Sequence, residues 1–305
     1  MTIGHRGTLA LTLAVSMLWG LWWVPVRLLE DAGMPGVWPS LAMGLCALPP
    51  LGWLAWRAGA GGALARALAG ALLVGVALML YGASLAFTDV VRAVVLFYLA
   101  PAWSTLIECV FMGRRWTWRS AAALSLGLAG VATIFRFQLS LDAINGGDAA
   151  ALASGLCWAV GSAVVFSRPG AKPEMLAFSA ALGMGLTGAA ALALGGPVMG
   201  GAPDTALLKA MPLAALAGLV YIAPALVVTV WAAQRLAPAT LSFLLTAEIV
   251  AGVGSGALFL AEPFGWPEAL GAALITAGAL TEALRPPPRR PGAPVPEGLR
   301  GPRLG

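Results

Sequence analysis

Apolar runs of about 20 residues recur along the whole chain, which is the length that an α-helix needs to cross a bilayer. They lie at residues 8–28, 36–56, 67–87, 92–112, 118–136, 148–167, 174–195, 210–233, 238–260 and 266–284. Charged residues make up only 10% of the sequence and hydrophobic residues 60%, whereas soluble domains have roughly 25% and 45–50%. We therefore expect an all-α membrane protein with ten transmembrane helices, joined by short loops rich in Gly, Pro or charge.

Basic residues are distributed unequally between the two sides of the membrane. The N-terminus, alternate loops and the C-terminal tail carry Arg6, Arg57, Arg66, Arg114, Arg115, Arg119, Arg168, Lys172, Arg235 and five tail arginines. The opposite side has only Arg27, Arg92, Arg136 and Lys209. The positive-inside rule then predicts that both termini are cytoplasmic, in a multi-pass protein of the bacterial inner membrane. We expect the Pro- and Arg-rich tail, residues 285–305, to be a disordered cytoplasmic segment.

Several classes of function are disfavoured by what the apolar runs contain. The net charge of +5 comes from loops and tail rather than from a basic domain, so we expect the bilayer as a partner and no nucleic acid. The three cysteines lie inside apolar runs, which argues against a disulfide framework or a zinc site. The single histidine, His5, precedes the first run, and the chain has no HExxH motif. We therefore expect no metal, no cofactor and no enzyme activity.

The ten runs divide into two sets of five that resemble one another. WTWRSAAALSLGLAGVA at 116–132 aligns without gaps with FGWPEALGAALITAGAL at 264–280, which places Trp118 on Trp266 and Gly130 on Gly278. The apolar runs also follow the same order in both sets. Because each set has an odd number of spans, we predict two inverted five-helix repeats, at residues 1–138 and 147–284. Inverted repeats are a transporter architecture whose substrate site lies near the midplane.

Four stretches carry a resemblance to a known family: LWGLWW at 18–23, LFYLAPAWSTLIECVFMGRRWTW at 96–118, GLCWAVGSAV at 155–164 and LLTAEIVAGVGSGALFLAEPFGWPEALGAALITAGAL at 244–280. Over residues 8–284 the chain resembles the drug/metabolite transporter superfamily in its ten-helix EamA-type branch. Glu248 and Glu262 occupy the two glutamates of that family's pattern. The sequence departs from the pattern because Ile249 replaces a Pro, Ala261 replaces a Gly and Arg114 stands where the first repeat often has Glu.

The stretches LFYLAP and FMGRRWTW, with WG and Arg27 in the first run, are similar to the aromatic amino-acid exporters of this branch. The resemblance implies a monomeric exporter of small metabolites, with aromatic or hydrophobic amino acids as substrates, that works by alternating access. Facilitated diffusion is favoured because the spans hold no histidine and the first span holds no acidic residue. A proton-coupled antiporter of drugs or other metabolites is the alternative, and a membrane-embedded enzyme or a structural or sensory protein are further ones.

Glu248 is the acidic residue that lies deepest in a predicted span. It follows Pro238 by ten residues, which at 1.5 Å per residue places it roughly 15 Å deep, near the midplane of a ~30 Å core. A charge at that depth costs about 2.5–3.5 kcal/mol, so we expect Glu248 to face the bundle interior, either as a substrate contact or in a structural or gating role. The candidate substrate-binding residues are Trp19, Met79, Tyr81, Tyr98, Trp158, Tyr221, Ser242 and Glu248.

Prolines and glycines inside the runs are candidate hinge or gating residues: Pro25, Pro101, Pro224, Gly252 and Gly256. Tryptophans near span ends are typical of interfacial belts, and this predicts surface positions for Trp38, Trp53, Trp56, Trp116, Trp118 and Trp266. We also expect Glu108, near the cytoplasmic end of the fourth run, to lie at the membrane interface.

Overall fold

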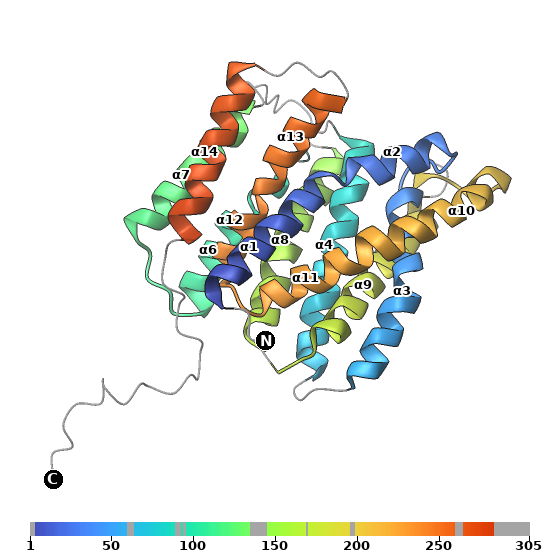
Figure 1. Cartoon of the computed structure of the whole chain (residues 1–305), viewed down its shortest axis with the longest axis horizontal. Helices are drawn as coiled ribbons and strands as arrows, with labels where there is room; N and C mark the ends of the chain where they lie inside the picture. Colours follow the sequence, from blue (N-terminus) through green and yellow to red (C-terminus); the bar gives the residue numbers. More distant parts are fainter. Residues whose placement is uncertain are drawn as a thin grey trace, which may run out of the picture.

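The chain forms a bundle of helices in the computed structural model, which describes residues 4–59, 64–88, 93, 96–134, 145–168, 170–195, 199–259 and 265–283 (Figure 1). The described part contains helices and no strand, as expected for a chain whose backbone groups must bond within one segment in lipid. The helices are α1 (His5–Gly20), α2 (Trp23–Asp31), α3 (Trp38–Ala58), α4 (Leu64–Phe87), α6 (Ala100–Phe111), α7 (Trp118–Ile134), α8 (Gly146–Phe166), α9 (Pro173–Gly195), α10 (Thr205–Ala217), the π-helix η2 (Gly218–Ile222), α11 (Ala223–Ala233), α12 (Pro238–Leu245), α13 (Ala247–Phe259) and α14 (Trp266–Ala283).

Each predicted apolar run overlaps one of these helices or a consecutive group of them, with most ends differing by a few residues. Among the described residues, five helical stretches are long and apolar enough to cross a membrane: His5–Asp31, Ala65–Ser84, Gly146–Phe166, Pro173–Gly195 and Thr205–Ala233. Two shorter apolar stretches lie at Pro238–Gly252 and Ala269–Gly278. The count of ten spans, their inverted arrangement and the cytoplasmic termini remain predictions. The tail 285–305 and Glu262 lie outside the described residues.

Three of the predicted hinge prolines lie in the first turn of a helix. Pro224 is the second residue of α11, which continues directly from the π-helix η2. Pro101 follows a turn at Tyr98–Leu99 and lies in the first turn of α6, and Pro25 follows a turn at Leu21–Trp22 and lies in the first turn of α2. A proline there costs little, because the N–H that it lacks has no partner inside the helix anyway. Pro25 and Pro101 therefore begin new helical pieces after breaks, whereas Pro224 lies inside the continuous helical stretch Thr205–Ala233, directly after its π-helical segment.

A further break separates α12 from α13 at Thr246. The break leaves the Leu245 carbonyl without its usual helical donor, because the N–H of Ile249 bonds to Thr246 O instead, at 3.1 Å. The hydroxyl of Ser16 on α1 donates to Leu245 O at 2.9 Å. A side chain from another helix thus satisfies the backbone, as a broken helix in a membrane requires.

Close approaches between helix backbones hold the bundle together. α4 packs against α8 and α9, α3 packs against α9, and α7 packs against α14; Figure 1 shows α7 and α14 side by side at one edge. A Cβ placed on Gly75 of α4 would lie 1.8 Å from Ala180 O of α9. Small residues permit such contacts, which replace the hydrophobic driving force that helices lack in lipid.

The N-terminus of α8 is fixed by hydrogen bonds to the end of α4. Asn145 and Asp148 form a reciprocal capping box, in which each side chain accepts from the other residue's backbone N–H at 3.0 Å. Asp148 also accepts from the hydroxyl of Thr88 at 2.7 Å. The capping box gives hydrogen-bond partners to two backbone N–H groups at the start of α8. The bond from Thr88 anchors this helix to the segment that follows α4.

Candidate functional site

Glu248 lies in the first turn of α13, directly after the break at Thr246. A carboxylate there faces the positive end of a helix dipole inside the bundle. The Tyr98 hydroxyl donates a hydrogen bond to Glu248 Oε1. Tyr98 is buried beside Val131, Ile249 and Ile275. The two candidates from the fourth and ninth predicted spans are thus direct partners, each next to a break in its own span.

The chain has three tyrosines, and each of them interacts electrostatically with this carboxylate. Tyr81 and Tyr221, like Tyr98, lie within electrostatic reach of Glu248. Phe97 connects two of them, with its ring centroid 4.6 Å from that of Tyr81 and 5.4 Å from that of Tyr98. We call Glu248, Tyr81, Phe97, Tyr98 and Tyr221 the tyrosine cluster.

A second group, the tryptophan cluster, consists of Trp19, Trp22, Tyr221 and Thr229. The Trp19 ring lies 5.0 Å from Trp22 and 6.0 Å from Tyr221, edge to face. Its indole N–H donates to Thr229 Oγ1 at 2.9 Å, and the Tyr221 hydroxyl donates to the Leu18 carbonyl. Tyr221 belongs to both clusters, so α1, η2 and α11 are tied to the surroundings of Glu248.

The indole nitrogen of Trp22 is buried without a hydrogen-bond partner among the described residues. A buried donor that lacks a partner costs about 1–3 kcal/mol, so such donors are rare in native structures. The tryptophan cluster therefore presents one donor that a ligand atom can satisfy.

Trp158 and Ser242 form a third contact, deeper between α8, α12 and α6. The Trp158 indole N–H donates to Ser242 Oγ at 3.1 Å, and Ser242 Oγ bonds to Ser104 Oγ at 2.9 Å. All three side chains are buried. Met79 is also buried; it packs against Gly188 of α9 and belongs to the same hydrophobic core as Trp19 and Trp158.

Gly20 and the predicted gating residue Gly252 lie where α1 meets α13. A Cβ on Gly20 would lie 2.2 Å from the Glu248 carbonyl oxygen, and a Cβ on Gly252 would lie 3.3 Å from the Gly20 carbonyl oxygen. The two backbones therefore touch at the level of Glu248. Gly256 lies further along α13.

Glu108, which we expected near the cytoplasmic membrane interface, is completely buried within the protein and forms an ion pair with Arg114. Glu108 Oε1 also accepts from the backbone N–H of Ala239 at 2.7 Å, in the first turn of α12. Arg114 Nη2 donates to Ser120 Oγ at 3.0 Å. A guanidinium and a helix N-terminus together compensate the buried carboxylate.

Gly113 makes this pair possible. Its φ of 67° is a left-handed conformation that glycine adopts readily, and it turns the chain back so that the Arg114 N–H bonds to Glu108 O at 3.0 Å. The opposite charges on either side of Gly113 are the sequence signal from which this pair could have been predicted.

Sequence reasoning missed Phe97, Ser104, Trp22 and Thr229, whose roles depend on contacts between distant segments.

The tryptophans predicted for the interfacial belts lie mostly on the surface. Trp53, Trp56, Trp116, Trp118 and Trp266 are 53–78% exposed. Trp38 is only partly exposed, and its indole N–H donates to Gly201 O at 3.2 Å. The exposed rings are available to lipid, while Trp38 secures the loop that precedes α10.

Comparison with known families identifies the first part of the chain. The EamA-like transporter family matches residues 6–136. The chain therefore contains an EamA-like transporter domain. Together with the apolar helices, this domain indicates a multi-pass membrane transporter of small metabolites. The superfamily resemblance is confirmed for this part of the chain, whereas the ten-helix branch and the aromatic amino-acid exporter subgroup remain predictions.

A solved structure titled "Crystal structure of protein" has a similar fold. It matches with a TM-score of 0.68 over 91% of this chain and 98% of its own length, at 20% sequence identity. At this identity the likeness concerns the fold alone. No curated protein matches the sequence.

Proposed function

We propose that this protein exports small metabolites from the bacterial cytoplasm across the inner membrane, with aromatic or hydrophobic amino acids as its substrates. The observation that carries this proposal is the tyrosine cluster, in which the Glu248 carboxylate accepts from Tyr98 and lies within electrostatic reach of Tyr81 and Tyr221. Its members come from α4, α13, η2 and the segment that precedes α6. Both predicted halves therefore contribute to it.

The chemistry of the two clusters suits an amphipathic cation or zwitterion. The Glu248 carboxylate is able to bind an ammonium group, and aromatic faces attract both ammonium groups and apolar side chains. The unpartnered indole N–H of Trp22 offers a donor to a substrate oxygen. An aromatic amino acid has an ammonium group for the Glu248 carboxylate, a ring for the aromatic faces and a carboxylate for the indole N–H of Trp22.

Transport by alternating access requires two halves that move against each other. The helix contacts are paired in the way that an inverted repeat predicts. α4 packs against α8, and the equivalent contact is that of α1 with α11. α6 packs against α8, and the equivalent contact is that of α1 with α12 and α13. α4 packs against α9, and the equivalent contact is that of α3 with α10 and η2. The offset of 148 residues between Trp118 and Trp266, extended toward the N-terminus without gaps, takes the break at Tyr98 to the break at Thr246. These correspondences support repeats at 1–138 and 147–284.

The Glu108–Arg114 pair offers a link that opens and closes. It joins α6 and the start of α7 to the first turn of α12, and so connects the two proposed halves on the side that carries the basic loops. We propose that the link closes the cytoplasmic end and separates when the cavity opens inward.

Flux measurements in proteoliposomes test the substrate and the coupling together. Labelled phenylalanine and leucine should equilibrate across the bilayer without a pH gradient. Glu248→Gln should reduce the flux at least tenfold, while Glu30→Gln, at an exposed carboxylate, should leave it unchanged. Absence of flux for every amino acid would overturn the substrate class. Concentrative flux that needs a pH gradient and is lost in Glu248→Gln would replace facilitated diffusion by proton-coupled antiport, for which the Tyr98–Glu248 hydrogen bond offers a proton partner.

A further inference from the structure

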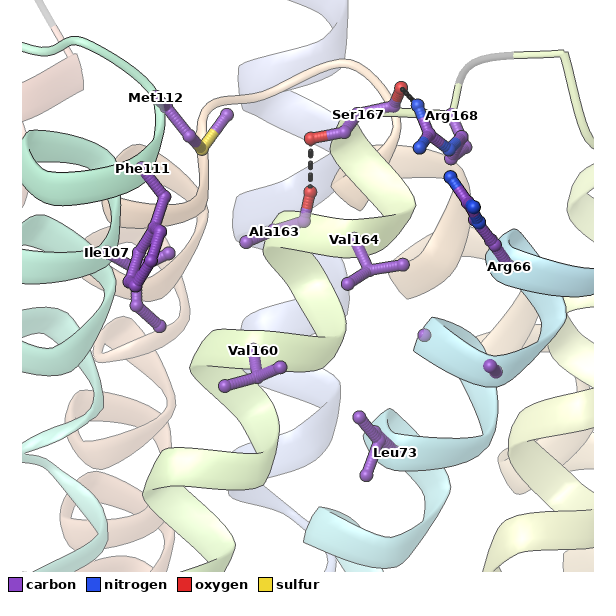
Figure 2. A pocket seen from close by; sticks show the side chains of 12 residues that line it. Arg66, Leu73, Ile107, Phe111, Met112, Val160, Ala163, Val164, Ser167 and Arg168 are labelled. Carbon is purple, nitrogen blue, oxygen red and sulfur yellow. Dashed lines mark hydrogen bonds between the residues drawn. The ribbon is translucent and has the colours of Figure 1, made fainter.

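A lateral groove of about 630 Å³ lies between α4, α6 and α8, away from the tyrosine cluster (Figure 2). Its walls are apolar: Leu73 comes from α4, Ile107 and Phe111 from α6, and Val160 and Val164 from α8. The adjoining surface of α6 is apolar as well, since Phe111 is 79% exposed. The groove thus continues directly onto a surface that lipid tails would contact.

Protein closes the floor of this groove. α4 and α8 approach so closely that a Cβ on Gly161 would lie 2.7 Å from Gly70 O, and a Cβ on Gly70 would lie 2.8 Å from Val164. The groove is therefore a slot on the outside of the bundle, at the junction between the two proposed halves. A molecule that occupies it enters from the side.

Two arginines lie together at one end of the groove. Arg66 is in the first turn of α4, and Arg168 follows the end of α8. Figure 2 shows their guanidinium groups facing each other above the apolar walls. Among the residues that the structure describes, no carboxylate lies within ion-pair distance of either one. Within the described residues, the guanidinium of Arg168 donates one hydrogen bond, to Ser167 O, and it is long at 3.4 Å.

Two like charges side by side repel each other, and an anion between them converts that repulsion into attraction. Guanidinium groups bind phosphate oxygens with particular geometric fit. An anion alone, however, would leave the apolar slot below the arginines unfilled. The ligand that fits both parts has a phosphate group at one end and a hydrocarbon chain at the other.

We propose that this groove binds an anionic phospholipid of the leaflet on the basic side of the protein. The headgroup phosphate lies between Arg66 and Arg168, and one acyl chain follows the groove past Val164 and Val160 toward the middle of the membrane. Basic pockets between transmembrane helices are a known form of lipid recognition. Because α4 and α6 belong to the first proposed half and α8 to the second, the lipid would touch both.

Titration of delipidated protein in detergent, followed by native mass spectrometry, tests this proposal. The probes are phosphatidylglycerol and phosphatidylcholine with identical acyl chains. The wild type should bind phosphatidylglycerol at least tenfold more tightly. Arg66→Gln/Arg168→Gln should weaken that binding about 30-fold, given the typical contribution of each basic side chain at an anionic lipid surface.

The matched control is Arg57→Gln/Arg235→Gln, which removes two charges from the same side of the protein. Both of these arginines are exposed and lie over tryptophan rings. The control should change phosphatidylglycerol binding less than threefold. Equal affinity of the wild type for the two lipids, or an equal loss in the control, would overturn the proposal.

A second variant tests the apolar part of the site without touching either arginine. Val160 is 36% exposed on the wall of the groove, so Val160→Trp fills the slot from a position with free space. It should weaken phosphatidylglycerol binding at least tenfold. Retention of full binding in Val160→Trp, combined with displacement of the lipid by inorganic phosphate, would show a site for free anions and refute the lipid assignment. Circular dichroism of each variant confirms that it is folded.

Discussion

Removal of the charge of Arg114 should destabilise this protein more than removal of any exposed arginine. Arg114→Leu removes the guanidinium that forms the buried ion pair with Glu108, whose carboxylate also accepts from the backbone N–H of Ala239. Glu108 is 0% exposed, so water cannot compensate. Breaking a buried ion pair from one side costs about 3–5 kcal/mol. Proteins of 150–250 residues lose roughly 2–4 °C per kcal/mol, and the lower figure suits this chain of 305 residues, so the melting temperature should fall by on the order of 10 °C.

The assay is thermal unfolding in detergent micelles, followed by the loss of the monodisperse peak in size-exclusion chromatography. Arg119→Leu is the matched control, because Arg119 is exposed and close in the chain; it should cost less than about 1 kcal/mol. The double variant Glu108→Leu/Arg114→Leu should recover most of the loss, since apolar residues often replace a buried pair without cost. The reasoning is refuted if Arg114→Leu melts within 2 °C of Arg119→Leu, or if the double variant is as unstable as the single one.

Three further substitutions probe the centre of the bundle. Tyr98→Phe removes the hydrogen bond to Glu248 and, because bonds to charged groups contribute about 1.5–3 kcal/mol, should lower transport activity in proteoliposomes roughly tenfold or more; unchanged flux would show that the bond plays no part. Gly20→Ala should reduce the yield of folded protein sharply because its Cβ would lie 2.2 Å from Glu248 O, whereas Gly146→Ala, with nothing within 4 Å, should not. Trp22→Phe should leave the melting temperature within about 3 °C, since it removes a donor without a partner, yet raise the KM for substrate; an unaltered KM would exclude Trp22 as a ligand contact.

Hydropathy located the helices with good accuracy but did not predict where they break. The run 148–167 corresponds to α8 at Gly146–Phe166, because the lipid environment imposes one length and one polarity on every spanning segment. The break at Thr246 has no such general cause. It is tolerated because Ser16, distant in the sequence, bonds to the carbonyl that the break exposes, and contacts of this kind have no local sequence signal.

In the candidate site, too, the sequence indicated candidate residues but not which residues they contact. Tyr98 and Glu248 were predictable as polar groups that lipid disfavours, but their partnership depends on how α13 packs beside the segment before α6. The positive-inside rule assigned Arg114 to the cytoplasmic side of the membrane, but this rule does not say whether a side chain is buried. The pairing of Arg114 with Glu108 required the turn at Gly113 as well as the approach of α12.

The contact between α1 and α13 also limits how this transporter can be engineered. At Gly20 there is no space for even a methyl group against Glu248 O, so mutant libraries that include this position will consist mainly of misfolded proteins. Trp19 and Trp22, one and two residues from Gly20, have rings in the tryptophan cluster, and under the proposed function smaller or polar side chains at these two positions should alter substrate preference. A library aimed at new substrates should therefore keep glycine at position 20 and vary the residues on either side of it.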